Sequence, residues 1–212
     1  MNPEQLAREV NKALENWSKD IEKLVVAIDG YTGIGKTTLL NELMKINPEV
    51  IAVNRDNFLY SRAITEEKLA KTGDRSKVFE LEVCDDEKLK ELVIAFKNGE
   101  PSHTVTVYDG VSGKLEETKT YDLTKKIMIV EGVFMFHPKP PLNELWDRRI
   151  YLYGDIAKID ERRIKREKER WGENYFPETH PDSYFRAVTT GLKRYFDTHK
   201  PHTTADLVLK VE

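Results

Sequence analysis

The residues with the clearest capacity for chemistry lie in the stretch VVAIDGYTGIGKTTLLNEL, residues 25–43. Within it, Gly30, Gly35, Lys36 and Thr37 satisfy the pattern G-x-x-x-x-G-K-[ST]. An apolar run precedes this pattern and a helix-like run follows it, so the loop would join a buried strand to a helix. The backbone N–H groups of such a loop point inward, and the helix N-terminus adds positive potential. We therefore predict that the loop binds the phosphates of a nucleoside triphosphate.

Each polar residue of this loop has an expected role. Lys36 would reach the terminal phosphates, and the Thr37 hydroxyl would ligate Mg²⁺. A glycine-rich turn that binds nothing is the alternative, but the motif and its sequence context together favour phosphate binding. The predicted nucleotide-binding residues of the loop are Gly30, Gly33, Ile34, Gly35, Lys36, Thr37 and Thr38.

Two carboxylates follow other apolar runs. Glu131 comes directly after IMIV, and Asp56 lies just beyond VIAV. Because the carboxyl ends of parallel strands border the ligand crevice of an open sheet, both side chains would face the phosphates. Glu131 would ligate Mg²⁺, and Asp56 would accept a proton from an attacking hydroxyl while contacting the metal shell. The alternatives are a solvent-facing glutamate and a turn-capping aspartate.

Three arginines recur at helical spacing in IDERRIKREKERWG, residues 159–172. Arg163, Arg166 and Arg170 fall three and four apart, which places them on one face of a helix. That face would close over the phosphates as a lid and supply guanidinium groups to the transition state. The alternative is a solvated helix with Glu–Arg pairs. Nucleic-acid binding is disfavoured because the glutamates of the same helix offset its basic charge.

Apolar runs and helical periodicity alternate along the chain. Apolar runs predict strands at residues 24–28, 50–53, 127–130, 149–153 and 205–211. Helical spacing predicts helices over residues 1–20, 36–45, 87–97, 156–171 and about 182–199. Residues 103–123 alternate, turn at Ser112-Gly113 and alternate again, which predicts an exposed β-hairpin. This order predicts an α/β fold in which helices cover both faces of a mostly parallel sheet.

Length and composition limit the class of protein. The chain has 212 residues, a net charge of −3 and 39% hydrophobic residues, which fits a single soluble domain spanning residues 1–212. Its one cysteine, Cys84, excludes an internal disulfide and fits a reducing compartment. No apolar run reaches the length that crosses a bilayer, and the N-terminus carries no apolar signal core. We expect a cytoplasmic protein with no nucleic-acid or membrane partner. The first helix and the hairpin are candidate surfaces for a homo-oligomer.

Taken together, these pieces resemble the uridine kinase family, within a wider group that includes phosphoribulokinase, pantothenate kinase and nicotinamide riboside kinase. The likeness runs from about Leu24 to Val211. Its anchors are AIDGYTGIGKTTL, the aspartate of NRDNF, VYDGVSGK, IMIVEG, RRIKREKERWG and the closing ADLVL. Many NTPases share the loop motif, whereas its combination with the other anchors is more specific to this family.

The resemblance implies a P-loop NTPase fold of the nucleoside-monophosphate-kinase type, with five parallel strands, flanking helices and a β-hairpin over the acceptor. It implies ATP with Mg²⁺ as the donor and a small hydroxyl compound, such as a nucleoside, as the acceptor. By match to the family's motifs, Asp56 is the catalytic base, and Thr37 and Glu131 are magnesium-side ligands. The family's lid arginines, which contact nucleotide and acceptor, correspond to Arg163, Arg166 and, less closely, Arg170.

On the acceptor side the chain both matches the family and departs from it. Tyr108 matches the hairpin tyrosine that lines the nucleoside site, and Phe79 matches a phenylalanine that precedes an Asp-His-Pro motif. Residues 80–82, Glu-Leu-Glu, replace that Asp-His-Pro. Thr106 stands where the family has a proline, and Gly113 where it has a histidine. These departures lie in base and sugar recognition, so the resemblance supports kinase activity more strongly than uridine as the acceptor.

Two other functions are compatible with a phosphate-binding loop. One is a switch-type NTPase or nucleotide-sensing regulator, although the sequence contains no N-K-x-D-type guanine reader. The other is a binding module that has lost catalysis, which the altered acceptor region suggests.

The histidines give no separate signal for a metal site. His199 and His202 share a loop but lack a third ligand nearby in the sequence. His103, His137 and His180 stand alone. We predict that His199 and His202 are surface loop residues.

Overall fold

A five-stranded sheet organises the computed structural model, which describes residues 1–173 and 175–212. The strand order is β2-β5-β1-β6-β7, and every pair is parallel. This arrangement confirms the predicted parallel sheet. The strands are β1 (Leu24–Gly30), β2 (Val50–Asn54), β5 (Ile127–Glu131), β6 (Arg148–Tyr153) and β7 (Leu207–Lys210).

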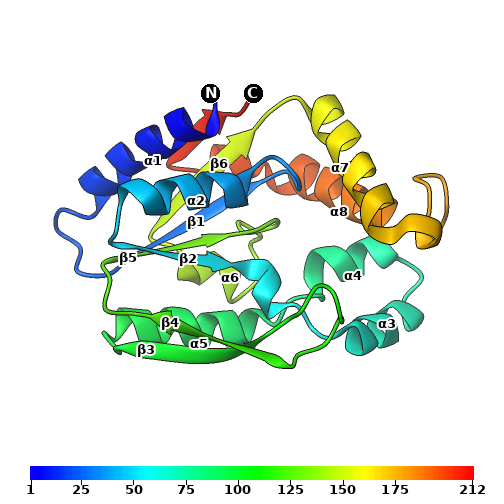
Figure 1. Cartoon of the computed structure of the whole chain (residues 1–212), viewed down its shortest axis with the longest axis horizontal. Coiled ribbons are helices and arrows are strands. Elements are labelled where there is room, and N and C mark those ends of the chain that lie inside the picture. Colours follow the sequence, from blue (N-terminus) through cyan, green and yellow to red (C-terminus); the bar gives the residue numbers. More distant parts are fainter.

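Helices cover both faces of this sheet (Figure 1). Successive residues of β1 point to opposite faces, so neighbouring side chains belong to different cores. Val26 belongs to a core shared with α1 (Pro3–Trp17), α2 (Lys36–Ile46) and α8 (Tyr184–His199). Val25 belongs to a second core on the other side, shared with α5 (Asp86–Lys97), the hairpin and α6 (Leu142–Leu145). All seven residues of β1 are buried, as a strand covered on both faces requires.

The predicted hairpin is present as β3 (Ser102–Val107) and β4 (Glu117–Asp122), which pair antiparallel. It is a separate two-stranded sheet rather than an extension of the central one. Val105, Val107 and Tyr121 are buried in the same core as α5, so one face of the hairpin packs while the other is exposed. The hairpin therefore lies across α5 and sends its connecting loop toward one end of the molecule (Figure 1).

Between β2 and α5 the chain forms elements that the sequence analysis did not predict. A 3₁₀ turn, η1 (Arg55–Phe58), leads to α3 (Arg62–Ala70) and α4 (Arg75–Leu81). None of the residues of α3 is buried, so it shows no apolar periodicity. The short α4 begins at Asp74, whose side chain accepts the N–H of Lys77.

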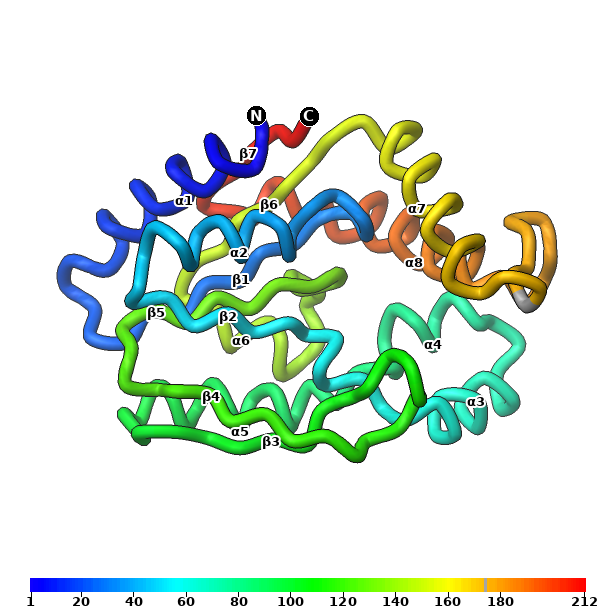
Figure 2. The backbone as a smooth tube through the Cα atoms, viewed as in Figure 1, coloured from blue at the N-terminus to red at the C-terminus, as the bar shows by residue number. Residues whose placement is uncertain are grey.

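The C-terminal part supplies a long charged helix and the last strand. The charged helix is α7 (Ile156–Trp171), followed by the short turn η2 (Gly172–Asn174). Another short turn, η3 (Pro201–Thr203), joins α8 to β7. Figure 2 shows both termini at one edge of the molecule, where the Met1 amino group lies 3.2 Å from the carbonyl oxygen of Lys210. Among the described residues, no helix is both long and apolar enough to cross a membrane.

Candidate functional site

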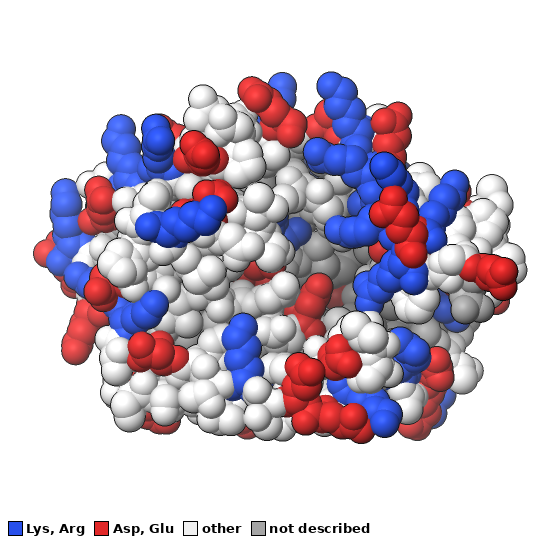
Figure 3. Space-filling model, viewed as in Figure 1, with Lys and Arg blue, Asp and Glu red and all other residues white. Residues whose placement is uncertain are grey.

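A cavity of about 960 Å³ opens beyond the carboxyl ends of the strands. Its walls come from the phosphate loop, η1, α3, α4, the hairpin loop and α7. Figure 3 shows this hollow with basic side chains along the α7 side and acidic side chains on the opposite rim. Ligands of open α/β sheets bind at this edge.

The phosphate loop has the backbone shape that its glycines permit. Gly35 is the N-cap of α2 and has φ 108°, in the left-handed region where a side chain would be strained. An ideal Cβ at Gly35 meets no atom within 4 Å, so the space in front of the helix N-terminus is open. Gly35, Lys36, Thr37 and Thr38 line the cavity with Gly33. These positions fit the predicted phosphate cradle.

Two predicted loop residues have other surroundings. Ile34 is buried in the core, and its N–H donates to the Tyr31 carbonyl at 3.2 Å. The carbonyl of Gly30 accepts the Lys36 ammonium at 2.9 Å. Neither Gly30 nor Ile34 lines the cavity, so their contribution is to shape the loop rather than to offer a side chain.

Lys36 is buried beneath the loop. Its ammonium donates to the carbonyls of Gly30 at 2.9 Å and Tyr31 at 3.2 Å. Burial lowers the pKa of Lys36, while the charges of Glu131, Asp29 and Asp56 act in the opposite direction. Lys36 is therefore surrounded by the charges of three carboxylates at the base of the loop.

Glu131 and Thr37 meet at the end of the central strands. The Thr37 hydroxyl donates to Glu131 Oε1 at 2.6 Å. Glu131 pairs in register with Ile28 of β1 and Asn54 of β2, which fixes its backbone at the cavity floor. Burial raises the pKa of Glu131, whereas Lys36 and Thr37 lower it. The predicted pair of magnesium-side ligands is thus in hydrogen-bond contact.

Asp56 lies on η1, one turn beyond β2, and its side chain is exposed to the same cavity. The backbone N–H of Asp56 donates a hydrogen bond to Asn54 Oδ1 at 2.8 Å. The preceding Arg55 is buried, donates to both carboxylate oxygens of Asp86 at 2.9 Å and 3.0 Å, and reaches the Val133 carbonyl at 2.8 Å. These contacts fix η1 and with it the direction of the Asp56 backbone.

The three arginines predicted to share a role have different positions. Arg166 and Arg170 line the cavity. Arg170 also donates to the Gly110 carbonyl of the hairpin loop at 2.6 Å, so α7 and the hairpin meet over the cavity.

Arg163 does not line the cavity and is 3% exposed. Its guanidinium donates to the Tyr31 hydroxyl at 3.1 Å and to Asp160 at 2.8 Å, and it stacks on the Phe185 ring at 4.3 Å. An ideal Cβ on Gly33 would lie 2.7 Å from its Cγ. These contacts place Arg163 between α7 and the phosphate loop, as a link between them.

The acceptor-side residues Phe79 and Tyr108 both line the cavity. Phe79 packs edge-on against Tyr184, with ring centroids 5.1 Å apart. The backbone N–H of Tyr108 donates to the Asn57 carbonyl at 3.0 Å, which holds the hairpin next to η1. The sequence analysis missed other members of this wall, because they lie on unpredicted elements or outside any motif: Tyr60, Arg62, Glu66, Arg75, Asp182 and Tyr184.

The prediction that His137 stands alone is wrong. Its ring lies 4.6 Å from that of His199, and the ligand atoms of both lie within 4.8 Å of a carboxylate oxygen of Glu80. Residues distant in sequence meet here because α4, α8 and the segment after β5 pack together. Burial lowers the pKa of His137 to about 4.

The comparisons with known proteins agree with this geometry. Residues 25–210 match the family described as the Phosphoribulokinase / Uridine kinase family. The chain belongs to this family. The match covers every strand of the central sheet and all the cavity elements described above.

Relatives and solved structures of this family resemble the chain along most of its length. A uridine kinase of Borrelia garinii subsp. bavariensis is 28% identical over 188 residues, covering 87% of this chain and 85% of the relative. A possible uridine kinase from Bacillus stearothermophilus superposes with a TM-score of 0.64 at 20% identity, covering 95% of this chain and 99% of that one. The phosphoribulokinase from Rhodobacter spheroides superposes with a TM-score of 0.62 at 13% identity, covering 89% of this chain and 70% of that one.

Membership in the Phosphoribulokinase / Uridine kinase family makes this chain an ATP-dependent kinase that phosphorylates a hydroxyl group of a small molecule. The family favours this function over a switch-type NTPase or a nucleotide-binding regulator without kinase activity. The P-loop NTPase fold of nucleoside-monophosphate-kinase type follows from the same matches.

Proposed function

We propose that the protein transfers the γ-phosphoryl group of Mg²⁺-bound ATP to a hydroxyl of a nucleoside-like acceptor, with Asp56 as the catalytic base. The observation that carries the proposal is the convergence of three groups on one cavity. The phosphate loop, the Thr37–Glu131 pair and Asp56 all face the same space, and they come from three different strand ends. Phosphoryl transfer depends mostly on such positioning and on charge neutralisation.

The donor set at the cavity floor fits Mg²⁺. A hydroxyl and a carboxylate oxygen lie 2.6 Å apart, with the Asp56 carboxylate on the same cavity. Mg²⁺ prefers such oxygen ligands and is usually held by few side chains together with phosphate oxygens and water. Thr37 and Glu131 would hold the ion, which would neutralise negative charge on the phosphates.

The remaining residues bind phosphate and exclude water. Amides of the loop from Gly33 to Thr38 would hold the phosphate oxygens, and Lys36 would turn from its loop carbonyls toward them. Arg166 and Arg170 would add guanidinium groups from the α7 side. Because Arg170 already contacts the hairpin loop, α7 can cover the reaction centre and keep water from competing with the acceptor.

The acceptor would enter between α3, α4 and the hairpin. Aromatic side chains form much of this wall, and Tyr60, Phe79, Tyr108 and Tyr184 are among them. Such a wall favours an acceptor with a planar ring, which can stack on aromatic faces. The names of the curated relatives point to the same class, since they are uridine kinases.

A coupled ADP-release screen tests this proposal. The panel holds nucleosides, riboside vitamins, pantothenate and small sugars, and at least one nucleoside-like compound should accelerate ADP release far above the rate without acceptor. Asp56→Asn should then lower kcat by roughly a hundredfold or more, because general-base assistance contributes 10²–10⁴ in rate, while ATP binding is retained. Asp20→Asn, an exposed carboxylate in the turn after α1 that does not line the cavity, is the matched control. Full activity in Asp56→Asn would refute the assigned base.

A further inference from the structure

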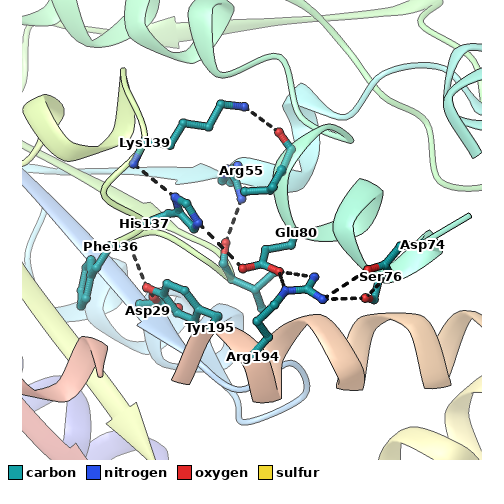
Figure 4. A network of polar contacts seen from close by, with 12 residues as sticks. Asp29, Arg55, Asp74, Ser76, Glu80, Phe136, His137, Lys139, Arg194 and Tyr195 are labelled. Carbon is teal, nitrogen blue, oxygen red and sulfur yellow. Dashed lines mark hydrogen bonds and ion pairs between the residues drawn. The ribbon is translucent and has the colours of Figure 1, made fainter. Parts of the chain in front are cut away.

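Two consecutive residues of α8 contact different parts of the site. Arg194 and Tyr195 project from the same turn of α8, and Figure 4 shows their side chains in separate branches of a network of polar contacts. The Tyr195 branch leads to the phosphate loop, and the Arg194 branch leads to α4. Neither residue lines the cavity, so any effect on catalysis must pass through the groups that they hold.

The Tyr195 branch ends at the first glycine of the phosphate loop. Its hydroxyl donates to Asp29 Oδ2 at 2.5 Å, and Asp29 Oδ1 accepts the N–H of Gly30 at 2.7 Å. The same hydroxyl accepts the N–H of Phe136 at 3.0 Å, in the segment that follows Glu131. Asp29 is completely buried. One hydroxyl therefore joins the start of the phosphate loop to the segment beyond the magnesium-side carboxylate.

The Arg194 branch ends on the acceptor side. Its Nε donates to Glu80 Oε2 at 2.7 Å, Nη2 contacts the same carboxylate, and Nη1 donates to Ser76 Oγ at 3.0 Å. Glu80 and Ser76 belong to α4 and are buried, while Arg75 and Phe79 of the same helix line the cavity. The guanidinium thus hydrogen-bonds two side chains of α4, Glu80 through Nε and Ser76 through Nη1, and two such bonds from one rigid group fix orientation as well as distance.

The backbones of α8 and α4 approach each other closely, which supports a fixed contact between the two helices. An ideal Cβ on Gly191 would lie 3.1 Å from the Ser76 carbonyl oxygen, so the two helices are closely packed one turn before Arg194. A larger residue would push α4 and its cavity-lining side chains outward.

The histidines beside Glu80 form part of this contact rather than a metal site. Arg194 already occupies one oxygen of Glu80, and the Nδ1 atom of His137 accepts the N–H of Lys139 at 3.2 Å. A histidine that binds a metal through Nε2 normally carries its proton on Nδ1 and donates it. Here Nδ1 faces a donor instead, so the cluster of Glu80, His137 and His199 fits polar packing.

We propose that Arg194 and Tyr195 are positioning residues that act on different parts of the cavity. Tyr195 fixes the position of the phosphate loop through Asp29, and Arg194 fixes the position of α4, on the acceptor side of the cavity, through Glu80. The kinetic part of this proposal rests on the proposed function, because it requires an acceptor that is phosphorylated. The two residues then have opposite kinetic signatures, although they are adjacent in sequence.

Steady-state kinetics separates the two branches. Tyr195→Phe should raise KM for ATP by roughly tenfold and leave KM for the acceptor within about twofold, because it removes the hydroxyl that holds Asp29 and Phe136. Arg194→Gln should do the reverse. Arg194→Lys keeps the charge without the rigid guanidinium group and should restore part of the acceptor affinity. A purely structural role would lower the active fraction and leave both KM values unchanged, which would overturn the proposal.

Matched controls come from neighbouring side chains. Tyr151→Phe changes a residue of β6 that pairs in register with Asp29 and whose hydroxyl makes no hydrogen bond among the described residues. Lys193→Gln removes a charge from the adjacent position of α8, where the ammonium is exposed and pairs only with Asp197 among the described residues. Both controls should leave the two KM values as in the wild type.

Hydrogen exchange provides a readout that does not depend on any acceptor. Arg194→Gln should accelerate amide exchange in residues 75–81 and spare residues 30–38, while Tyr195→Phe should do the opposite. Equal acceleration of both segments in either variant, or of neither, would refute the separation of branches. If no acceptor is found but the exchange pattern holds, the proposed function fails and the positioning roles stand.

Discussion

At the scale of single residues, the contact between Thr37 and Glu131 depends on the backbones of β5 and α2, which hold the two side chains next to each other. Glu131 ends β5, which is paired on both sides, and Thr37 is the second residue of α2, directly after the loop. Burial raises the pKa of Glu131, which the Lys36 charge opposes. A group with these neighbours is well placed for a divalent cation, whose charge would favour the ionised carboxylate.

Glu131→Gln keeps the shape of this side chain and removes its charge. We expect kcat to fall by roughly a hundredfold, on the scale of losing one electrostatic contact to the transferring group, and the Mg²⁺ concentration for half-maximal rate to rise. Titration of activity against Mg²⁺ measures both effects. Glu49→Gln, an exposed carboxylate just before β2, should match the wild type. An unchanged Mg²⁺ dependence in Glu131→Gln would argue against a metal-side role.

At the scale of elements, α7 is attached to the phosphate-loop region through Arg163 and Asp160, which both hydrogen-bond the Tyr31 hydroxyl. Arg163 bonds Tyr31 of the loop region and Asp160 of its own helix, and it packs on Phe185 of α8. Further along the same helix, Arg170 reaches the hairpin loop. The helix is thus fixed at one point on the loop and touches the hairpin at another, with the cavity between.

Removing the fixed point should loosen the helix as a whole. Arg163→Gln removes the ion pair with Asp160, which still accepts the hydrogen bond of the Tyr31 hydroxyl at 3.2 Å. We expect the free energy of unfolding to fall by roughly 1–3 kcal/mol, with faster amide exchange across residues 156–171. ATP hydrolysis without acceptor should rise, because a looser α7 admits water. The neighbouring Arg162→Gln changes an exposed side chain and should alter neither quantity. If instead Arg163→Gln abolished turnover with no change in exchange, Arg163 would contact the phosphates directly.

The predictable elements were those with a local signal in the sequence. The motif around Lys36 fixed the loop, and the rule that parallel strands end at a common edge placed Asp56 and Glu131 beside it. The sequence analysis did not predict α3 and α4, because α3 buries no residue and α4 is only seven residues long. The burial of Arg163 was missed for another reason. Helical spacing gives the face of a residue but not the tyrosine or phenylalanine that another element brings against it.

At the scale of the whole molecule, α8 connects the halves of the site across the body of the fold. Its buried face packs on the sheet, on α4 and on the segment after β5, and His137 and His199 meet at this junction. Such a junction has a pH dependence of its own, because partial burial of the His137 imidazole favours its neutral form.

The direction of that dependence follows from the pKa of His137, which burial lowers from 6.5 to about 4, with the nearby His199 and Lys139 adding to the effect. Between these two values the unfolded chain binds a proton at this position and the folded chain does not, so the unfolded state is favoured as pH falls. Stability should therefore decline from about pH 6.5 toward about pH 4, and His137→Gln should flatten this part of the curve. Urea unfolding at several pH values measures the slope, with His202→Gln, an exposed histidine, as the control. An unchanged slope in His137→Gln would mean that other groups dominate acid unfolding, and that the junction at α8 does not set the pH limit of the fold.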